Sequence, residues 1–419
     1  MSRTPLDAWI GNKIGRSSHW TRADLHAWQL HKLNETLSLV RSKSRFYRQH
    51  LAAMPEFLNS VDKFAEFPFT TAADIRRNPL QFVCNSQDEI TRVVTLQTSG
   101  TTGNPKRLYF TKADQELTID FFAVGMSTLV GAGDRVMICL PGHTPGSVGD
   151  LLRIGLQRIG AVPFPFGSID HLQEALDFIR QYRPTCLAGS PMQMLGIARR
   201  WYPELPSPKK LLLSTDYLTD CVIETLQNTW HCEIFDHYGS TEMGLGGGVE
   251  CTAHQGLHMR EADMLFEIID PQSGKNLPPG EMGEVVFTTL TRSGMPLIRY
   301  RTGDWSRNLP GKCVCGSEVL RLANPRGRLS NDWLVNGNLV GMKELDEIFL
   351  RIPGALHVQY ILEEKAMQIK LLLLEEKDGK GIMQAVREAG ALVGKKIRVE
   401  MNIQPEYMVS LAKRRMEQR

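Results

Sequence analysis

The sequence of 419 residues has neither a long apolar run nor an excess of charge of one sign, and each absence excludes a class of protein. No run approaches the roughly 18 apolar residues that span a bilayer, which excludes an integral membrane protein. The 49 Lys and Arg residues nearly balance the 46 Asp and Glu residues, so charge suggests neither a nucleic-acid nor a membrane partner. The first residues, MSRTPLDAWIGNKIG, lack the apolar core of a secretory signal.

Cysteine is also scarce, and the sequence has no internal repeat and no low-complexity tract. Eight cysteines in a chain of this length do not form a disulfide framework, which favours a reducing, cytoplasmic location. The length allows two or three domains at about 100–200 residues each. A composition of 42% hydrophobic and 23% charged residues is typical of a globular protein. We therefore expect a cytoplasmic globular protein, and the sequence leaves open whether it is a homodimer.

From about residue 92 short apolar runs alternate with amphipathic stretches, which predicts α/β structure. The expected strands include 136–140 and 211–214, and the expected helices are 172–182, 192–201 and 220–229. Residues 20–52 have apolar side chains at helical spacing and predict surface helices. Residues 257–304 predict antiparallel β structure, with strands at 265–269 and 284–289 on either side of a turn rich in Gly and Pro.

The last ninety or so residues differ in pattern from the rest of the chain. They read as a helix, two strands, a helix and a strand, at 343–351, 356–363, 366–374, 381–393 and 397–403. This order predicts a small C-terminal α+β domain over 332–419, joined by a hinge at 327–331 to a large N-terminal domain of residues 1–326.

A loop rich in glycine and hydroxyl groups, TSGTTGNPK, occupies residues 98–106. Gly100 and Gly103 would let the backbone approach an anion closely, and Lys106 would offset its charge. Hydroxyl donors come from Thr98, Ser99, Thr101 and Thr102. The loop is not a Walker A motif, which needs GxxxxGK[ST] before a helix. A polar hairpin turn is the alternative that a bare Gly/Ser/Thr cluster would favour.

Nine residues in this order resemble the phosphate-loop motif of the adenylate-forming superfamily, which includes acyl- and aryl-CoA ligases. Two later segments resemble that superfamily's motifs and follow in the same order, IFDHYGSTE at 234–242 and LIRYRTGD at 297–304. The chain is most similar to the phenylacetate–CoA ligase-like subgroup, on FPFTTAADIRRNP at 67–79, GLHMREADMLFEIIDPQSGKNLPPGEMGEVVFTTL at 256–290 and CVCG at 313–316. The resemblance implies an α/β adenylation domain of layered sheets with a small β-barrel-like part, followed by a small α+β domain.

The resemblance also implies roles for single residues. Phosphate binding would fall to the loop and Lys106, adenine binding to Tyr238 with Gly239 and Ser240, and α-phosphate binding to Thr241. Glu242 would bind Mg²⁺, Asp304 the ribose, and Arg328 the ribose and phosphate. From the residues alone, an aromatic ring can stack on a base and a carboxylate can hold Mg²⁺. A strand end followed by a solvated turn explains residues 238–242 equally well.

The C-terminal part departs from the family pattern at its catalytic lysine. A motif like Gly-Lys-Ala-x-Arg normally supplies that lysine, and aligning this chain on Ala412 and Arg414 places Leu411 at the lysine position. Lys413 is the candidate replacement, displaced by about 6–7 Å in an extended segment. The hinge also departs, because Gly-Arg-x-Asp-Asp becomes GRLSN at 327–331. Adenylate formation should therefore be slow, or depend on Lys413 or another cation.

The resulting hypothesis is an AMP-forming acid–thiol ligase that uses ATP and Mg²⁺ to join an aromatic or other carboxylic acid to CoA. The substitution at Leu411 keeps two alternatives open, an adenylate-forming enzyme without CoA transfer and a non-catalytic nucleotide-binding protein. His143 and His237 are candidates for contacting the acid, although a structural role is the simpler explanation for His237.

A second candidate site consists of Cys251, His258, Cys313 and Cys315. Three thiolates and an imidazole would form a closed tetrahedral site suited to structural Zn²⁺. His254 is an alternative ligand. Spacing alone favours buried free cysteines, whereas similarity to a pattern in the phenylacetate–CoA ligase-like subgroup favours zinc.

Overall fold

The computed structural model describes residues 3–16, 20–96, 104–328, 333–335, 338–375, 379–403 and 417–418. The chain divides into two compact units. The first contains Met1–Thr128, Ile154–Arg158 and His237–Pro325, and the second contains Leu129–Arg153, Ile159–Asp236 and Arg326–Arg419. Helix α6 (Val148–Arg158) and strand β7 (Glu233–Tyr238) each begin in the second unit and end in the first. Within the described ranges, no helix combines the length and the apolar character needed to cross a bilayer.

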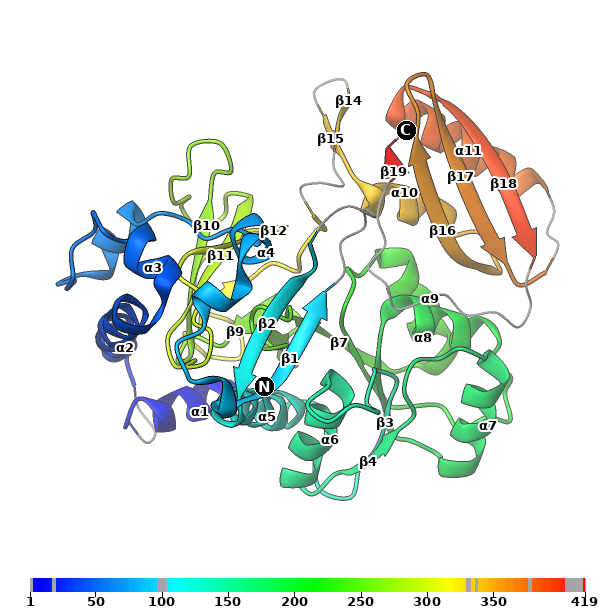
Figure 1. Ribbon diagram of the computed structural model, residues 1–419. Coiled ribbons are helices and arrows are strands. Elements are labelled where there is room, and N and C mark those ends of the chain that lie inside the picture. Colours follow the sequence, from blue (N-terminus) through cyan, green and yellow to red (C-terminus); the bar gives the residue numbers. More distant parts are fainter. Residues whose placement is uncertain are drawn as a thin grey trace. The chain divides into compact units, whose positions relative to one another are not determined.

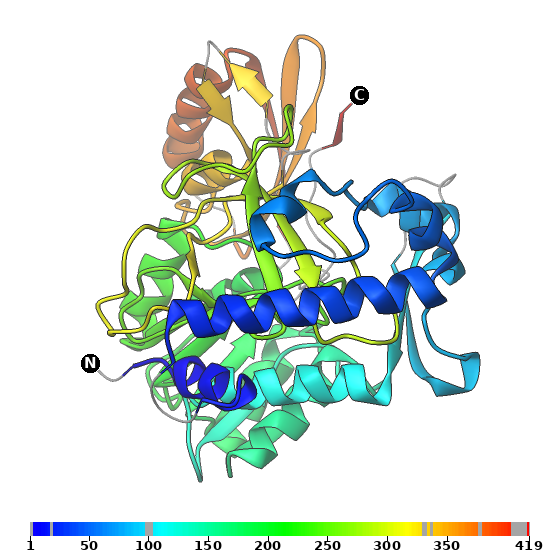
Figure 2. The same cartoon turned by 90° about the vertical axis from the view of Figure 1, so that its left-hand side faces the viewer.

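Helices form the N-terminal part of the first unit. They are α1 (Pro5–Lys13), α2 (Arg22–Lys43), α3 (Arg45–His50), α4 (Ala72–Arg77) and α5 (Lys112–Met126), with short 3₁₀ helices η1 (Val61–Glu66), η2 (Pro79–Phe82) and η3 (Gln87–Glu89). A Thr-x-x-Asp capping box starts α2, α4 and α5 and satisfies amides that a helix end leaves unpaired. In Figure 2 α2 is the long dark-blue helix, with α1 and the cyan α5 below it. The Trp9 indole N–H of α1 donates to Asp120 of α5 at 2.8 Å.

Antiparallel strands form the rest of the first unit (Figure 1). β1 (Ile90–Leu96) pairs with β2 (Lys106–Thr111), and β10 (Met264–Ile269), β11 (Gly283–Thr289) and β12 (Tyr300–Ser306) form a sheet in that order. The end of β7 pairs with β8 (Gly248–Glu250), which is followed in the sheet by β9 (Leu257–Met259) and β13 (Arg321–Leu322). The antiparallel structure predicted for residues 257–304 is thus confirmed.

Aromatic side chains make up much of the core of the first unit, which includes Tyr47, Phe82 and Phe287. The Tyr47 hydroxyl lies 3.1 Å from Thr70 Oγ1 and accepts a hydrogen bond of 2.9 Å from the Ile298 backbone N–H. Because β12 begins two residues after Ile298, the core fixes the segment that leads into this strand.

The second unit contains a parallel sheet in the order β7-β6-β5-β3-β4. Its other strands are β3 (Arg135–Ile138), β4 (Val162–Pro165), β5 (Cys186–Gly189) and β6 (Lys210–Leu213), and they alternate along the chain with α7 (Leu172–Tyr182), α8 (Pro191–Arg199) and α9 (Asp220–Trp230). Such alternation is the connection that parallel strands require. The α/β class predicted from the sequence is confirmed.

The end of the chain forms an α+β arrangement within the second unit. Its elements are β14 (Trp333–Val335), β15 (Asn338–Val340), α10 (Met342–Phe349), β16 (Ala355–Leu362), β17 (Ala366–Leu373), α11 (Gly379–Val393), β18 (Lys396–Ile403) and β19 (Glu417–Gln418). The sheet order is β18-β17-β16-β19. The five elements expected after residue 342 all occur, with ends within two residues of those predicted.

Helix α10 shares its core with the helices of the parallel sheet. Leu345 and Phe349 of α10 belong to the same buried cluster as residues of α8 and α9. The Glu347 carboxylate accepts hydrogen bonds from the backbone N–H groups of Asp220 and Cys221, at the start of α9. Residues 326–419 therefore group with the parallel sheet, and the role of 327–331 as a hinge between domains stays a prediction.

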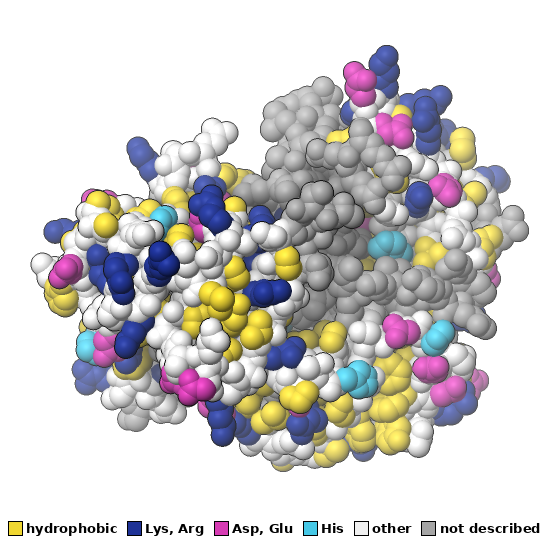
Figure 3. Space-filling view, viewed as in Figure 1, with side chains coloured by type: hydrophobic (Ala, Val, Ile, Leu, Met, Phe, Trp, Pro, Cys, Tyr) yellow, Lys and Arg dark blue, Asp and Glu magenta, His cyan; other side chains and the backbone are white. Residues whose placement is uncertain are grey.

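Strand β4 is an edge strand of the parallel sheet, and its apolar side chains are partly exposed. On the face shown in Figure 3, hydrophobic side chains gather where α7 and β4 lie. The rings of Phe164 and Phe178 each contact that of Tyr182, with centroids 5.1 and 4.3 Å apart. Val162 is 43% exposed. This edge of the sheet therefore presents an apolar surface.

Candidate active site and metal centre

Three polar side chains of the first unit meet at one point, and Glu242 and Tyr300 are buried whereas Lys106 is half-buried. Lys106 is the first residue of β2, Tyr300 is the first residue of β12, and Glu242 lies in the turn after β7. The Lys106 ammonium contacts Glu242 Oε1. The Tyr300 hydroxyl accepts a hydrogen bond from Lys106 Nζ at 3.2 Å and donates one to Glu242 Oε1 at 3.1 Å. The structure thus brings together the lysine and glutamate that the motifs single out, and adds a tyrosine.

The turn that carries Glu242 is held by close backbone approach. A Cβ atom at Gly239 would lie 2.4 Å from the carbonyl oxygen of Leu245, so only glycine fits there. The Ser240 hydroxyl accepts a hydrogen bond from the Met243 backbone N–H at 3.3 Å. Arg292 donates to the Glu242 carbonyl oxygen at 2.8 Å. The partly buried Thr241 lies in the same turn, so the backbone fixes the position from which the Glu242 side chain extends.

Tyr238 and Asp304 form a second buried contact in the first unit. The Tyr238 hydroxyl donates to Asp304 Oδ2 at 2.8 Å. Tyr238 ends β7 and Asp304 lies within β12, so this contact joins the strand that precedes Glu242 to the strand that begins at Tyr300. The residues assigned to adenine and to ribose therefore lie next to each other, as one bound nucleoside would require.

Several predicted site residues lie outside this group. Thr98, Ser99, Gly100, Thr101, Thr102, Gly103, Leu411 and Lys413 lie outside the described residues. Arg328 and His143 belong to the second unit. There His143 lies beside Gly167, where a Cβ atom would be 3.2 Å from His143 Nε2.

His237 lies in the first unit near two phenylalanine rings. The ring centroids of Phe121 and Phe122 are 6.2 and 6.1 Å from that of His237. Burial lowers the pKa of His237 to about 4, so its imidazole is uncharged at neutral pH. An uncharged imidazole can contact an acid through hydrogen bonding or packing, but it offers no positive charge to a carboxylate.

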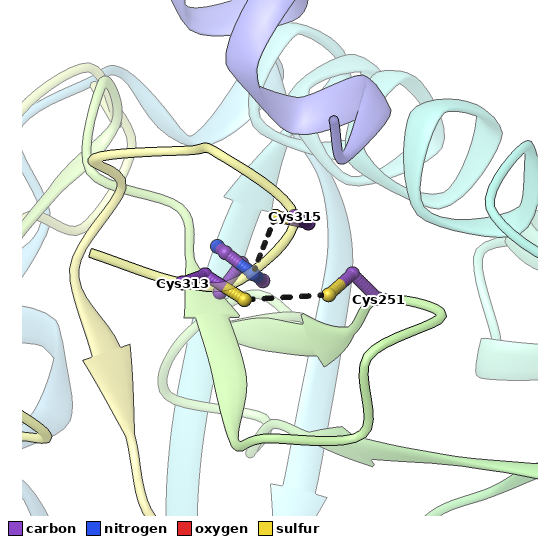
Figure 4. Close-up of side chains that lie close together, drawn as sticks. Cys251, Cys313 and Cys315 are labelled. Atoms are coloured by element: carbon purple, nitrogen blue, oxygen red, sulfur yellow. Dashed lines mark hydrogen bonds between the residues drawn. The ribbon is translucent and has the colours of Figure 1, made fainter. Parts of the chain in front are cut away.

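The four predicted zinc ligands form a compact cluster in the first unit (Figure 4). Cys251 Sγ and Cys313 Sγ are 3.8 Å apart, and Cys315 Sγ lies 3.7 Å from His258 Nε2. All four candidate ligand atoms lie within 4.8 Å of one another, and all four residues are buried. With a Zn–S bond of about 2.3 Å, the edge of a sulfur tetrahedron is about 3.8 Å. The cluster therefore has the composition and the spacing of a tetrahedral metal site. His254 faces Glu250 instead.

The shifted pKa values of two of these groups, His258 and Cys315, also suit a metal. Burial, together with the charge of Arg321, lowers the pKa of His258 to about 4, which keeps the imidazole neutral as metal binding requires. Burial acts to raise the pKa of the Cys315 thiol, but hydrogen bonds outweigh it and the pKa is lowered. The donors include the backbone N–H groups of Ser317 and Thr4. Burial raises the pKa of the Cys251 thiol to about 12, so a cation would be needed to hold that sulfur as a thiolate.

The sequence did not reveal the roles of Tyr300 and Arg292. Tyr300 is the first residue of the YRTGD segment, so the motif contained a signal, but only its aspartate was given a role. Arg292 lies in an ordinary polar turn, and nothing in its sequence context indicates that it holds the backbone of Glu242.

Comparison with known proteins defines the class. A family described as AMP-binding enzyme matches residues 36–291, more than half of the chain. The protein belongs to this family, and with it to the adenylate-forming enzymes. In structure it resembles 2-hydroxyisobutyryl-CoA ligase in the postadenylation state, with a TM-score of 0.82 at 19% identity over 95% of this chain and 90% of that one. That similarity concerns the fold.

Curated relatives narrow the class. The phenylacetate–coenzyme A ligase of Thermus thermophilus is 29% identical over 82% of this chain and 79% of its own length. The enzyme of the same name from Aromatoleum evansii is 30% identical over 81% of this chain and 78% of its own. These relatives confirm the resemblance to the phenylacetate–CoA ligase-like subgroup. The protein is an ATP-dependent, AMP-forming ligase.

Proposed function

We propose that the protein activates a carboxylic acid, aromatic or of another kind, to an acyl-adenylate and transfers the acyl group to CoA. The similarity to phenylacetate–coenzyme A ligases supports this activity. The observation that carries it is the meeting of Lys106, Glu242 and Tyr300 in the unit that also joins Tyr238 to Asp304.

The proposed reaction brings two anions together. A carboxylate oxygen attacks the α-phosphorus of ATP and pyrophosphate leaves; the CoA thiol then attacks the acyl carbon and AMP leaves. Fixed positive charge must offset the repulsion in the first step. Lys106 supplies such a charge in this proposal, and it follows the proposed phosphate loop of residues 98–103 in the sequence. The Glu242 carboxylate has the oxygen ligands that Mg²⁺ prefers, and bound Mg²⁺ would neutralise phosphate charge.

The remaining site residues bind and orient the nucleotide in this proposal. Tyr238 offers its ring to the adenine, Asp304 accepts from the ribose hydroxyls, and Arg328 contacts the ribose and phosphate. Thr241 donates its hydroxyl to the α-phosphate. His143 and His237 are proposed contacts of the acid, with the neutral His237 acting through hydrogen bonding.

Pyrophosphate release with ATP and Mg²⁺ tests this function, across a panel of aryl and aliphatic acids with and without CoA. Release that depends on one acid and yields its CoA thioester would support the full reaction. Release without thioester would favour an adenylate-forming enzyme with another acceptor. ATP binding without release for any acid would favour a non-catalytic nucleotide-binding protein.

Lys413 is the proposed replacement for the lysine that Leu411 displaces. If Lys413 offsets the developing charge, Lys413→Ala should lower the rate of pyrophosphate release by about 10²–10³. Arg415→Ala removes a neighbouring cation of the same segment and serves as the matched control. Equal rates for the wild type and Lys413→Ala would assign the charge to another residue.

We also propose that Cys251, His258, Cys313 and Cys315 hold a structural Zn²⁺. Their number, burial and spacing support this site. Four protein ligands leave no open position for substrate, so the ion would stabilise the fold without taking part in the reaction. The zinc content of the purified protein, measured by mass spectrometry, is the direct test.

A further inference from the structure

Tyr300 contacts both charged groups of the proposed ATP site through a single atom. Its hydroxyl oxygen accepts from Lys106 Nζ at 3.2 Å and its hydroxyl hydrogen is donated to Glu242 Oε1 at 3.1 Å. The side chain is 3% exposed, so the hydroxyl group has little water to bond instead. The Tyr300 hydroxyl group thus forms a hydrogen bond with the Lys106 ammonium and another with the Glu242 carboxylate, two groups that also contact each other.

The Tyr300 side chain has fewer rotatable bonds than the side chains of the two groups that it contacts. The Tyr300 ring packs against Phe287 with centroids 5.5 Å apart, and its backbone pairs with Phe287 in β11 and with Thr70 on the other side. Lys106 and Glu242 instead reach the site through flexible side chains. A rigid donor and acceptor between two flexible charges can define where both charges rest.

ATP and Mg²⁺ would compete with the contact between Lys106 and Glu242. A lysine paired with a carboxylate must loosen that pair to meet phosphate oxygens, and the carboxylate must turn to meet a metal ion. Separating a buried ion pair is costly when either charge is left without a partner. A hydroxyl group lowers that cost, because it can keep a hydrogen bond to each charge while the pair opens.

We propose that Tyr300 is a positioning residue that retains Lys106 and Glu242 at the site when Mg²⁺ and ATP separate them. This inference rests on the proposed function and gives a role to Tyr300, a residue to which the sequence motifs assigned none. Tyr300 acts through the other two residues and does not itself contact the reacting atoms.

The test is the affinity for ATP, measured by calorimetry in excess Mg²⁺ and again in EDTA. Tyr300→Phe keeps the ring and removes only the hydroxyl group, so the improvement in affinity that Mg²⁺ brings should fall by about tenfold or more. Tyr47→Phe is the matched control, because it also removes a buried hydroxyl group with two hydrogen bonds in the first unit but touches neither charge. Its Mg²⁺ effect should equal that of the wild type.

A double-mutant cycle then separates positioning from a general structural loss. In a Lys106→Met background, Tyr300→Phe should change ATP affinity less than it does in the wild type, because one of the two charged groups that Tyr300 holds is gone and no ion pair is left to separate. Additive effects, or a Tyr300→Phe protein with the wild-type response to Mg²⁺, would overturn the role of Tyr300 alone. A wild-type protein that binds no ATP in either buffer would overturn the proposed function and this role with it.

Discussion

The first unit contains two buried polar clusters that differ in their balance of charge. The active-site cluster of Lys106, Glu242 and Tyr300 contains a cation, an anion and a hydroxyl group that bonds to both. The Cys/His cluster of Cys251, His258, Cys313 and Cys315 contains four metal-ligand atoms within 4.8 Å of one another, and none of its members is a cation when His258 is neutral.

On the roles proposed above, this difference separates a site that binds nucleotide in order to react from a site whose metal ion would stabilise the fold. Opposite charges in the active-site cluster contact each other, so neither charge depends on a bound nucleotide for a partner. The sulfur atoms of the Cys/His cluster gain little from one another as thiols, whereas a bound cation would join all four residues, and its binding energy would be folding energy. Removing the metal ion should therefore lower the stability conferred by the Cys/His cluster, whereas withholding nucleotide from the active-site cluster should prevent turnover.

Loss of the metal should give the largest effect. We expect a chelator that strips zinc to lower the melting temperature by about 10 °C or more, since the strands and loop that carry the ligands lose their common anchor. Cys313→Ser should do the same and lower the zinc content. The experiment combines metal analysis with thermal unfolding.

Cys84→Ser is the matched control for this prediction. Cys84 is a buried free cysteine of the same unit that lies outside the cluster, so its substitution should leave the zinc content unchanged and alter the melting temperature less. Purified protein without zinc, or a melting temperature that the chelator does not change, would contradict a structural metal site.

Breaking the ion pair of the active-site cluster should give an intermediate effect. Lys106→Met or Glu242→Gln alone removes one charge of an ion pair whose side chains are 12% and 8% exposed, and each should lower the melting temperature by about 5 °C. The double variant removes both charges and should lose less than either single variant, although none of the three should release pyrophosphate at the wild-type rate. Additive losses in the double variant would show that the two charges do not stabilise each other.

Apolar spacing in the sequence predicts where the helices and strands lie, but it does not predict which elements pack against one another. The sequence predicted a helix at 343–351, where Leu345 and Phe349 stand four residues apart, yet that spacing is the same whether the helix packs on its own domain or on α8 and α9. Only the contacts show that residues 326–419 share a core with the parallel sheet. Local pattern fixes which face of a helix is apolar, and tertiary packing decides what covers it.

Some residues of the candidate sites could likewise be identified from the sequence, whereas others are evident only from the structure. The four Cys/His positions came from residue type and from similarity to a subgroup pattern, because spacing alone favoured free cysteines, and the structure brings them together. Lys106 and Glu242 came from motifs, and they meet as well. Tyr300 was missed because its role depends on the direction of its hydroxyl group, which the packing of its ring on Phe287 sets. Residue type alone does not distinguish a core tyrosine from one that orients two charges.

The smallest expected effect is the pH dependence of stability, which comes from two buried histidines, His237 and His258. Burial lowers the pKa of both to about 4 from 6.5, so between these values the unfolded chain binds protons that the folded protein does not, and stability falls as the pH drops below about 6.5. A zinc ion would hold His258 unprotonated. In the metal-loaded protein, His237 is then the one of these two histidines whose protonation destabilises the fold as the pH falls. From pH 7 to 5 the melting temperature of His237→Asn should therefore fall by about 2 °C less than that of the wild type, while the exposed His31→Asn control should follow the wild type. Identical pH profiles for the wild type and His237→Asn would show that His237 is not the group that makes the folded protein sensitive to acid.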